Sequence, residues 1–385
     1  MSGPLTRRAS LKRIAFAAAA CSLPDIFRPV ASYGADVPPQ PTPTDAEHAA
    51  IANVAQQFMD KFQVPGLSVA VARHGQFVYS KGFGLADTSG EKLTPSHLFR
   101  IASVTKPITS VAIFTLVEQD RLKLSDLVFG ADGLLRFDYA AAYPELVKKI
   151  TVEHLLTHTC GGWSNDANDP MFHDSAMAVG DLITWTVDNL PLQSEPGSRY
   201  AYSNFGFCLL GRIIEKISGK HYDDFVRLNV LEKCGIKDMR LAGNTRNDRA
   251  PGEVIYYGQY DEDPYRWNIR RMDSHGGWIA TPTDLVQFAL RVDGFGYVPN
   301  ILTPSTIRTM TTPSAAFSHY AKGWCVNEVP NWWHLGSLPG TTTVLVRTAS
   351  GLCWAAFANT RATGMDGAID RMVWDMVRTV PAWKA

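Results

Sequence analysis

A serine and a lysine three residues apart, Ser103 and Lys106, stand at the front of an apolar stretch. The apolar residues behind them recur at helical spacing, and Pro107 is tolerated only in a helix's first turn, so a helix starts near Ser103. Residues three apart share one helix face, so the Lys106 amine reaches the Ser103 hydroxyl. The pair can be a nucleophile with its base, or Ser103 can be an ordinary helix cap. The same spacing at Ser89 and Lys92, in a polar turn, shows that spacing alone decides little.

Two later stretches also place polar groups beside apolar runs. YSN (202–204) directly precedes a predicted helix, where Ser203 or Asn204 is suited to capping. HLGS (334–337) precedes or opens a strand near the C-terminus. Gly336 there either allows a ligand to approach the backbone closely or relieves crowding at the strand end.

Lysine and tyrosine are not bases at neutral pH unless their surroundings change them. Their ordinary pKa values are ~10.4 and ~10, and lowering one by about three units takes roughly 4 kcal/mol. Burial would lower the pKa of Lys106, and a Lys106 ammonium beside Tyr202 would lower that of the tyrosine. Either residue can therefore be the main base, and both assignments are kept.

Sheet patterns at both ends of the chain surround a helical middle. A capping box at Thr44 and Glu47 begins an amphipathic helix that ends at Pro65-Gly66. Alternating apolar residues predict hairpins that turn at His74-Gly75 and near Ser350-Gly351. Together with a helix from about Val104 to about Glu118, this predicts an α+β fold, an antiparallel sheet with an inserted all-helical region. The expected organisation is a linker at 36–44 and one domain at 45–380, with a sheet part at about 45–100 and 270–380 and a helical part at about 100–270.

Several motifs in one order resemble those of a known family. SVTK (103–106), YSN (202–204) and HLG (334–336) resemble the motifs of the penicillin-recognising serine hydrolases. The similarity is greatest to the class C β-lactamase branch, which also contains DD-peptidases, D-aminopeptidases and family VIII carboxylesterases. TVEHLLTHTCGGW (151–163) and SHGGWIATPTDLVQFA (274–289) resemble the same family, so the resemblance covers roughly residues 45–380. It implies a β-lactamase/DD-peptidase-like fold, with an antiparallel sheet flanked by helices beside an all-helical region.

The resemblance also implies roles for individual residues. Ser103 would be the nucleophile that accepts the acyl group, with Lys106 as its partner and Tyr202 sharing the proton work. Asn204 would donate a hydrogen bond to the substrate's amide or to Lys106. The backbone N–H groups of Ser103 and Ser337 would form the oxyanion hole.

The third motif departs from that of true class C β-lactamases, which have Lys-Thr-Gly there. His334 is only partly charged near neutral pH, and Leu335 offers no hydrogen bond. The departure favours esters, amides or peptides over β-lactams, because this motif lacks the fixed positive charge and the hydroxyl that help hold a substrate carboxylate. Three tryptophans are candidates for an apolar acyl pocket, although core packing is the commoner role of this residue: Trp163, Trp332 and Trp333.

The first 35 residues predict an export signal. TRRASLKR (6–13) is followed by an apolar stretch well short of the ~18–20 residues that span a bilayer. The arginine pair resembles a twin-arginine signal, although Ser10 stands where phenylalanine is usual. We expect a periplasmic or otherwise exported protein, with lipid attachment at Cys21 as a minor alternative.

Composition and spacing argue against several other functions. Lys plus Arg and Asp plus Glu both total 37, and no basic stripe suggests nucleic-acid binding. His154 and His158 have the spacing of a zinc pair, but Leu155 stands where a metalloprotease has glutamate. NDANDP (165–170) lacks the glycine of a calcium loop and is interpreted as a solvated loop. No cofactor or metal is expected.

The sequence as a whole therefore predicts an exported serine hydrolase that forms an acyl-enzyme on Ser103. Carboxylesterase or peptidase/amidase activity ranks first. β-Lactamase activity ranks second, and a penicillin-binding sensor or a noncatalytic scaffold is the alternative from another class. The expected partner is a small ester, amide or peptide.

Overall fold

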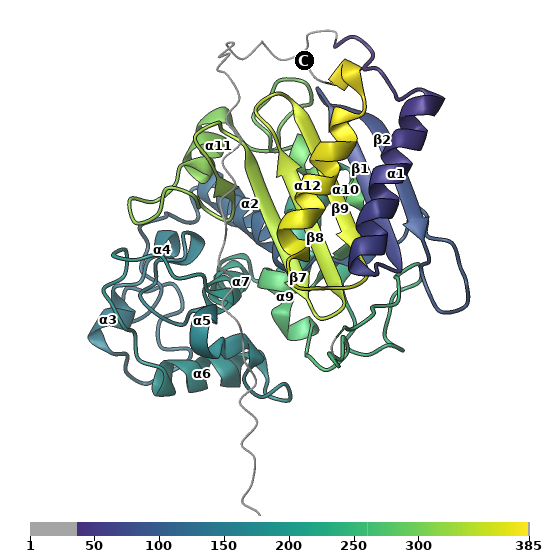
Figure 1. Ribbon diagram of the computed structural model, residues 1–385. Helices are drawn as coiled ribbons and strands as arrows, with labels where there is room; N and C mark the ends of the chain where they lie inside the picture. Colours follow the sequence, from purple (N-terminus) through teal and green to yellow (C-terminus); the bar gives the residue numbers. More distant parts are fainter. Residues whose placement is uncertain (1–36, 260, 384–385) are drawn as a thin grey trace, which may run out of the picture. The chain divides into compact units, whose positions relative to one another are not determined.

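A six-stranded antiparallel sheet forms the centre of the part of the chain that the computed structural model describes, residues 37–259 and 261–383 (Figure 1). The strand order is β2-β1-β9-β8-β7-β6, so strands from the two ends of the chain pair directly. The predicted turn at His74-Gly75 is confirmed, and both residues have the positive φ that a tight hairpin turn needs. The bounds are β1 (Gly66–Arg73), β2 (Gln76–Gly84), β6 (Cys325–Val326), β7 (Trp332–Leu338), β8 (Thr341–Arg347) and β9 (Leu352–Ala358).

One face of this sheet is covered by the first and last long helices, α1 (Asp45–Phe62) and α12 (Met365–Arg378) (Figure 1). The predicted capping box of Thr44 and Glu47 is confirmed, with both reciprocal hydrogen bonds present. The helix ends at Phe62, slightly before the predicted Pro65-Gly66, because Gln63 adopts the left-handed conformation.

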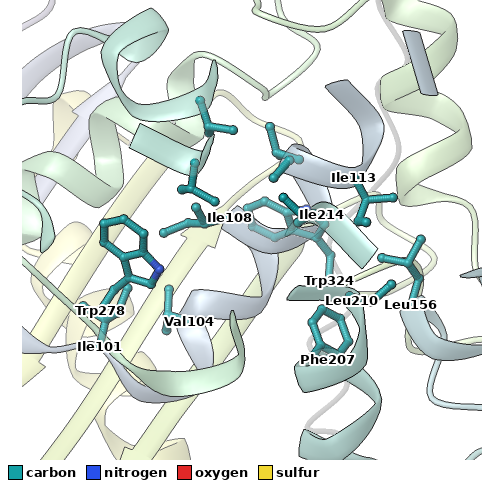
Figure 2. Packing of buried hydrophobic residues seen from close by; sticks show 14 of the residues in the cluster. Ile101, Val104, Ile108, Ile113, Leu156, Phe207, Leu210, Ile214, Trp278 and Trp324 are labelled. Atoms are coloured by element: carbon teal, nitrogen blue, oxygen red, sulfur yellow. The ribbon is translucent and has the colours of Figure 1, made fainter. Parts of the chain in front are cut away.

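The opposite face packs against α10 (Pro282–Leu290). The same core cluster continues into α2 (Thr105–Glu118) and α7 (Asn204–Ser218), which pack against each other. Figure 2 shows the packing around Ile108 and Ile113 of α2, with Phe207 and Ile214 of α7 nearby. Every residue of α2 from Thr105 to Leu116 is buried. This helix therefore lies in the middle of the core rather than at its surface, and its buried residues include polar ones such as Lys106 and Thr109.

The predicted α+β fold is confirmed, and helices are the main regular elements of the segment between the two halves of the sheet (Figure 1). A second, three-stranded sheet has the order β3-β5-β4. Its strands are β3 (Phe99–Arg100), β4 (Arg240–Leu241) and β5 (Trp278–Ala280). The remaining α-helices are α3 (Glu145–Lys148), α4 (Val152–Leu156), α5 (Asn165–Asn168), α6 (Val179–Asn189), α8 (Tyr222–Val226), α9 (Asp273–Gly276) and α11 (Pro304–Thr311). Short 3-10 turns are η1 (Ala102–Val104), η2 (Pro170–Phe172), η4 (Glu232–Cys234), η5 (Arg270–Met272) and η6 (Pro381–Trp383), and η3 (Arg227–Leu231) is a short π-helix.

The predicted export signal at residues 1–35, with Cys21, lies outside the described residues. Within the described ranges, no helix is both long enough and apolar enough to span a membrane. Cys325 in β6 and Cys353 in β9 are both free thiols.

Candidate active site

Ser103 lies on η1, the short turn that joins β3 to α2. Ala102 directly before it has φ of 47°, a left-handed conformation that is costly for a residue with a Cβ. No side chain caps the start of α2, so the interpretation of Ser103 as a helix cap is wrong. Ser103 is partly exposed, whereas Lys106 is fully buried behind it. The serine hydroxyl is therefore presented toward solvent by a fixed and strained turn.

The sheet holds this turn through β7 and β8. The Thr343 hydroxyl donates to the Ile101 carbonyl at 2.9 Å, and the Thr341 hydroxyl donates to the Arg100 carbonyl at 2.8 Å. A Cβ at Gly336 would overlap both the Ile101 carbonyl oxygen and the Thr343 hydroxyl. Of the two interpretations of Gly336, the structure supports relief of crowding. A side chain at this position would collide with Ile101, in the segment that leads to the nucleophile.

The Lys106 amine has three polar neighbours. Nζ lies 3.1 Å from Ser103 Oγ, 2.7 Å from Asn204 Oδ1 and 3.0 Å from the His275 carbonyl oxygen. The last two atoms are acceptors only. A neutral amine has two N–H groups and one lone pair, so donating to these two acceptors directs its lone pair at the Ser103 hydroxyl.

Burial makes this amine a usable base. Desolvation lowers the pKa of Lys106 to about 7, and the negative charge of Asp169 opposes that shift only in part. A substantial fraction of Lys106 is then neutral at neutral pH. The expectation that burial lowers the pKa of this lysine is consistent with its position in the core.

Tyr202 lies on the other side of the nucleophile. Its ring is under the Lys106 amine, with Nζ 4.8 Å from the ring centroid. The Ser103 side chain is close enough to its hydroxyl to act on the pKa of the tyrosine, although less strongly than burial does. Desolvation raises the pKa of Tyr202 well above its ordinary value. The expectation that Lys106 lowers this pKa is wrong, because the amine faces the ring rather than the hydroxyl and burial dominates. Tyr202 is protonated at neutral pH.

The two residues after Tyr202 have different roles. Ser203 is the cap of α7, since its hydroxyl accepts from the Gly206 N–H at 3.0 Å. Asn204 turns toward the site, where Oδ1 accepts from Lys106 and Nδ2 donates to Asp169 Oδ2 at 2.7 Å. The prediction that Asn204 donates to Lys106 is therefore wrong, because the amide oxygen faces the amine. Donation to the substrate stays a prediction, since the NH₂ group has a second N–H besides the one that faces Asp169.

On β7, His334 is buried beneath the site. Its Nδ1 lies 2.7 Å from the Leu335 carbonyl oxygen, and its Nε2 lies 3.2 Å from the Tyr320 hydroxyl. Desolvation, followed by the nearby Lys106 charge, lowers the pKa of His334 to about 3. The expected partial charge near neutral pH is wrong, and this strand presents a neutral imidazole.

Ser337 follows on the same strand, which packs against η1. The residue is paired with Thr342 of β8. Its main chain therefore borders the turn that carries Ser103. The assignment of its N–H to an oxyanion hole stays a prediction.

The sequence interpretation missed several residues around this site. Residues 165–170, interpreted as a solvated loop, include Asp169 and also Asn165, whose Oδ1 accepts from the Asn204 N–H at 2.9 Å. The carbonyl of His275 holds Lys106, and Nδ1 of His158 accepts from the Ser203 N–H at 3.1 Å. No signal pairs Asp169 with Asn204, because 35 residues separate them.

Of the two interpretations of the tryptophans, the structure supports core packing rather than an acyl pocket. Trp163 and Trp332 are buried in the core, and the Trp163 indole donates to the Leu190 carbonyl at 2.8 Å. The Arg347 guanidinium lies over the Trp332 ring, with its central carbon 4.1 Å from the ring centroid. Trp333 packs with the apolar cluster on the α12 side of the sheet, away from the helices around Ser103.

Comparisons with known proteins find relatives over most of the chain. A family model described as Beta-lactamase matches residues 51–376. Unguisins hydrolase ungD′ of Aspergillus campestris (strain IBT 28561) is 26% identical over 332 residues, 80% of this chain and 61% of that protein. Penicillin-binding protein 4* of Bacillus subtilis (strain 168) is 26% identical over 313 residues, 75% of this chain and 66% of that protein. The chain thus spans about three fifths to two thirds of the length of these relatives.

The fold is also similar to that of a solved structure, D-amino acid amidase from Ochrobactrum anthropi SV3 complexed with L-phenylalanine. The TM-score is 0.73 and the identity is 23%, with 89% of this chain and 100% of that chain covered.

Proposed function

The chain belongs to the Beta-lactamase family, and from this premise we propose that it is a serine hydrolase that forms an acyl-enzyme on Ser103. The observation that carries the proposal is the Lys106 amine 3.1 Å from Ser103 Oγ, with its other polar contacts made by acceptors. That arrangement meets the main requirement of a serine nucleophile, a base within hydrogen-bonding reach.

The proposed reaction has two steps. Ser103 Oγ attacks the substrate carbonyl carbon while its proton passes to Lys106, and the charge that develops on the carbonyl oxygen is stabilised by backbone N–H groups. Collapse of the intermediate breaks the bond to the leaving alcohol or amine, which takes up the proton through Tyr202. Water then attacks the acyl carbon, gives its proton to the Lys106–Tyr202 pair and releases the carboxylic acid, and Ser103 regains its hydrogen.

This mechanism divides the proton work between the two candidate bases. Lys106, with a pKa of about 7, is the group that changes its protonation state. Tyr202 stays protonated because burial raises its pKa, so it serves as a relay and as a donor to the leaving group.

We propose a neutral ester or amide as the substrate, with an ester or peptide ahead of a β-lactam. A substrate carboxylate needs a fixed positive charge, and the imidazole that β7 offers is neutral because burial lowers the pKa of His334 to about 3. Similarity to a D-amino acid amidase and to penicillin-binding protein 4* supports the wider class and keeps amides and penicillins as comparators.

A panel of three substrates tests this ranking: an activated short-chain ester, a D-amino acid amide and benzylpenicillin. We expect kcat/KM to be highest for the ester and lowest for the penicillin, with no turnover by Ser103→Ala. Fastest turnover of the penicillin would instead identify a β-lactamase. A penicillin adduct that persists for hours, without turnover of the other two, would identify a penicillin-binding sensor.

We further propose export, on the basis of the leader sequence at residues 1–35. Replacing the Arg7-Arg8 pair by Lys-Lys should leave the protein in the cytoplasmic fraction, whereas the unchanged chain should be found outside it. Equal distribution of the two proteins would contradict dependence on the arginine pair.

A further inference from the structure

The segment 165–170 forms a support behind Asn204. Asp169 accepts two hydrogen bonds, one per oxygen: Oδ2 from Asn204 Nδ2 at 2.7 Å and Oδ1 from the Met171 N–H at 3.0 Å. Asn165 Oδ1 holds the backbone N–H of Asn204 at 2.9 Å. Part of the Asp169 residue is exposed, but its carboxyl group faces inward toward the Asn204 amide.

Two donors aimed at separate oxygens require a carboxylate at this position. An asparagine side chain has one oxygen and one NH₂ group, so one of the two donors would face another donor. The carboxylate therefore fixes the Asn204 NH₂ group on its own side. The amide oxygen of Asn204 is then left facing Lys106, 2.7 Å from Nζ.

The orientation of Lys106 follows from that of Asn204. With Asn204 Oδ1 and the His275 carbonyl as acceptors for two N–H groups, the amine directs its lone pair toward Ser103. A reversed Asn204 amide would present N–H groups to Lys106 and would compete for that lone pair. Asp169 thus acts on the nucleophile through two intermediate side chains.

The charge of Asp169 acts on Lys106 as well. The other titratable groups that face the amine are Tyr202 and three histidines, His158, His275 and His334. Burial lowers the pKa of all three histidines, and Lys106 lowers them further, so they are neutral. Burial also keeps Tyr202 protonated. Among the described residues, Asp169 is the charged group whose field opposes the loss of the proton from Lys106. Burial raises the pKa of Asp169 itself to about 6, so its carboxylate is charged at pH 7 and loses that charge as the pH falls below about 6.

We propose that Asp169 is a positioning residue which, through Asn204, fixes the orientation of the Lys106 amine and supplies its balancing negative charge. The inference rests on the proposed function, since it concerns the base that serves Ser103. It assigns a role to a segment that the sequence alone indicated to be a solvated loop.

The test is the pH dependence of Ser103 labelling by a fluorophosphonate, measured as a second-order rate constant. In the unchanged protein we expect an acid limb near pH 7, where Lys106 loses its proton. Asp169→Asn removes a negative charge that stabilises the ammonium, so the pKa of Lys106 falls and the limb moves to lower pH by about half a unit or more. The rate on the plateau should also fall, by about tenfold, because Asn204 is no longer fixed.

Two further variants make the result specific. Asp169→Glu restores the charge, so its limb should stay near that of the unchanged protein. Asp166→Asn removes one charge from the same segment at an exposed position and should change neither limb nor plateau. Thermal unfolding checks that each variant is folded. If Asp169→Asn does not fold, Asp169→Ser takes its place, because a serine hydroxyl still accepts from the Met171 N–H.

The possible outcomes separate the two proposals. A fall in rate at every pH, with the limb unmoved, would mean a purely structural role and would overturn the inference. An unchanged profile would overturn it too. Absence of any labelling at Ser103 in the unchanged protein would contradict the proposed function itself, before Asp169 is considered.

Discussion

Replacing Lys106 by methionine should lower kcat/KM for the preferred substrate by about 10³-fold, a size typical of removing a general base. Methionine keeps the length and apolar character of the side chain but has no lone pair to accept the Ser103 proton. The loss should appear mainly in kcat, since Lys106 contacts the reacting serine rather than the bound substrate. Initial rates of ester hydrolysis measure it. Retention of more than a tenth of the activity would contradict the assignment of Lys106 as the base.

The same variant should be more stable than the unchanged protein at neutral pH. Burial lowers the pKa of Lys106 to about 7, so between about pH 7 and the ordinary lysine value near 10.4 the unfolded chain binds more protons than the folded one. The free energy of unfolding of the unchanged protein therefore rises with pH across that window. Lys106→Met removes this dependence and should gain about 1–3 kcal/mol at pH 7.

An exposed lysine provides the control. Lys123 lies shortly after the end of α2 and is exposed, so Lys123→Met should change neither the rate nor the pH dependence of unfolding. Chemical denaturation of both variants at several pH values makes the comparison. A lower stability of Lys106→Met across the whole range would contradict the account of a desolvated lysine.

Replacing Tyr202 by phenylalanine should lower kcat/KM by about 10²-fold while leaving the acid limb of the pH profile near pH 7. The ring under Lys106 is kept, so the packing around the amine should persist. Only the hydroxyl that relays protons is lost. Lys106 still titrates in this variant, so the acid limb should remain if Lys106 is the main base. Loss of the limb would instead identify Tyr202 as the group that titrates.

A neighbouring tyrosine is the matched control for that experiment. Tyr200 stacks on Phe317, 4.3 Å between ring centroids, and lies two residues from Tyr202. Tyr200→Phe should keep nearly full activity. An equal loss in both variants would indicate a general disturbance of the aromatic cluster and would contradict a specific role for the Tyr202 hydroxyl.

Much of the fold is predictable because local physics determines it. The capping box at Thr44, the hairpin turn at His74-Gly75 and the start of α2 near Pro107 each depend on residues close together in the chain. These signals are strong, since each turn or cap suits few residue types. Pairing of β1 with β9 joins residues almost 300 apart, and only the similar apolar patterns at both ends indicate it.

The site is predictable only where the motif residues themselves touch. Ser103 and Lys106 share one turn, so their contact follows from helix geometry. The charge states of His334 and Tyr202 do not follow, because they depend on burial by distant segments. The hydrogen bond between Asp169 and Asn204 could not be predicted from the sequence either, because it joins residues 35 positions apart.

Peptide mapping after fluorophosphonate labelling tests the central claim most directly. The account predicts one covalent adduct per chain, located on Ser103, which is absent from Ser103→Ala. Ser89→Ala is the matched control, since Ser89 has the same spacing to a lysine but lies in an exposed turn, and it should be labelled like the unchanged protein. An adduct on another serine, or an adduct that persists in Ser103→Ala, would contradict the assignment of Ser103 as the nucleophile.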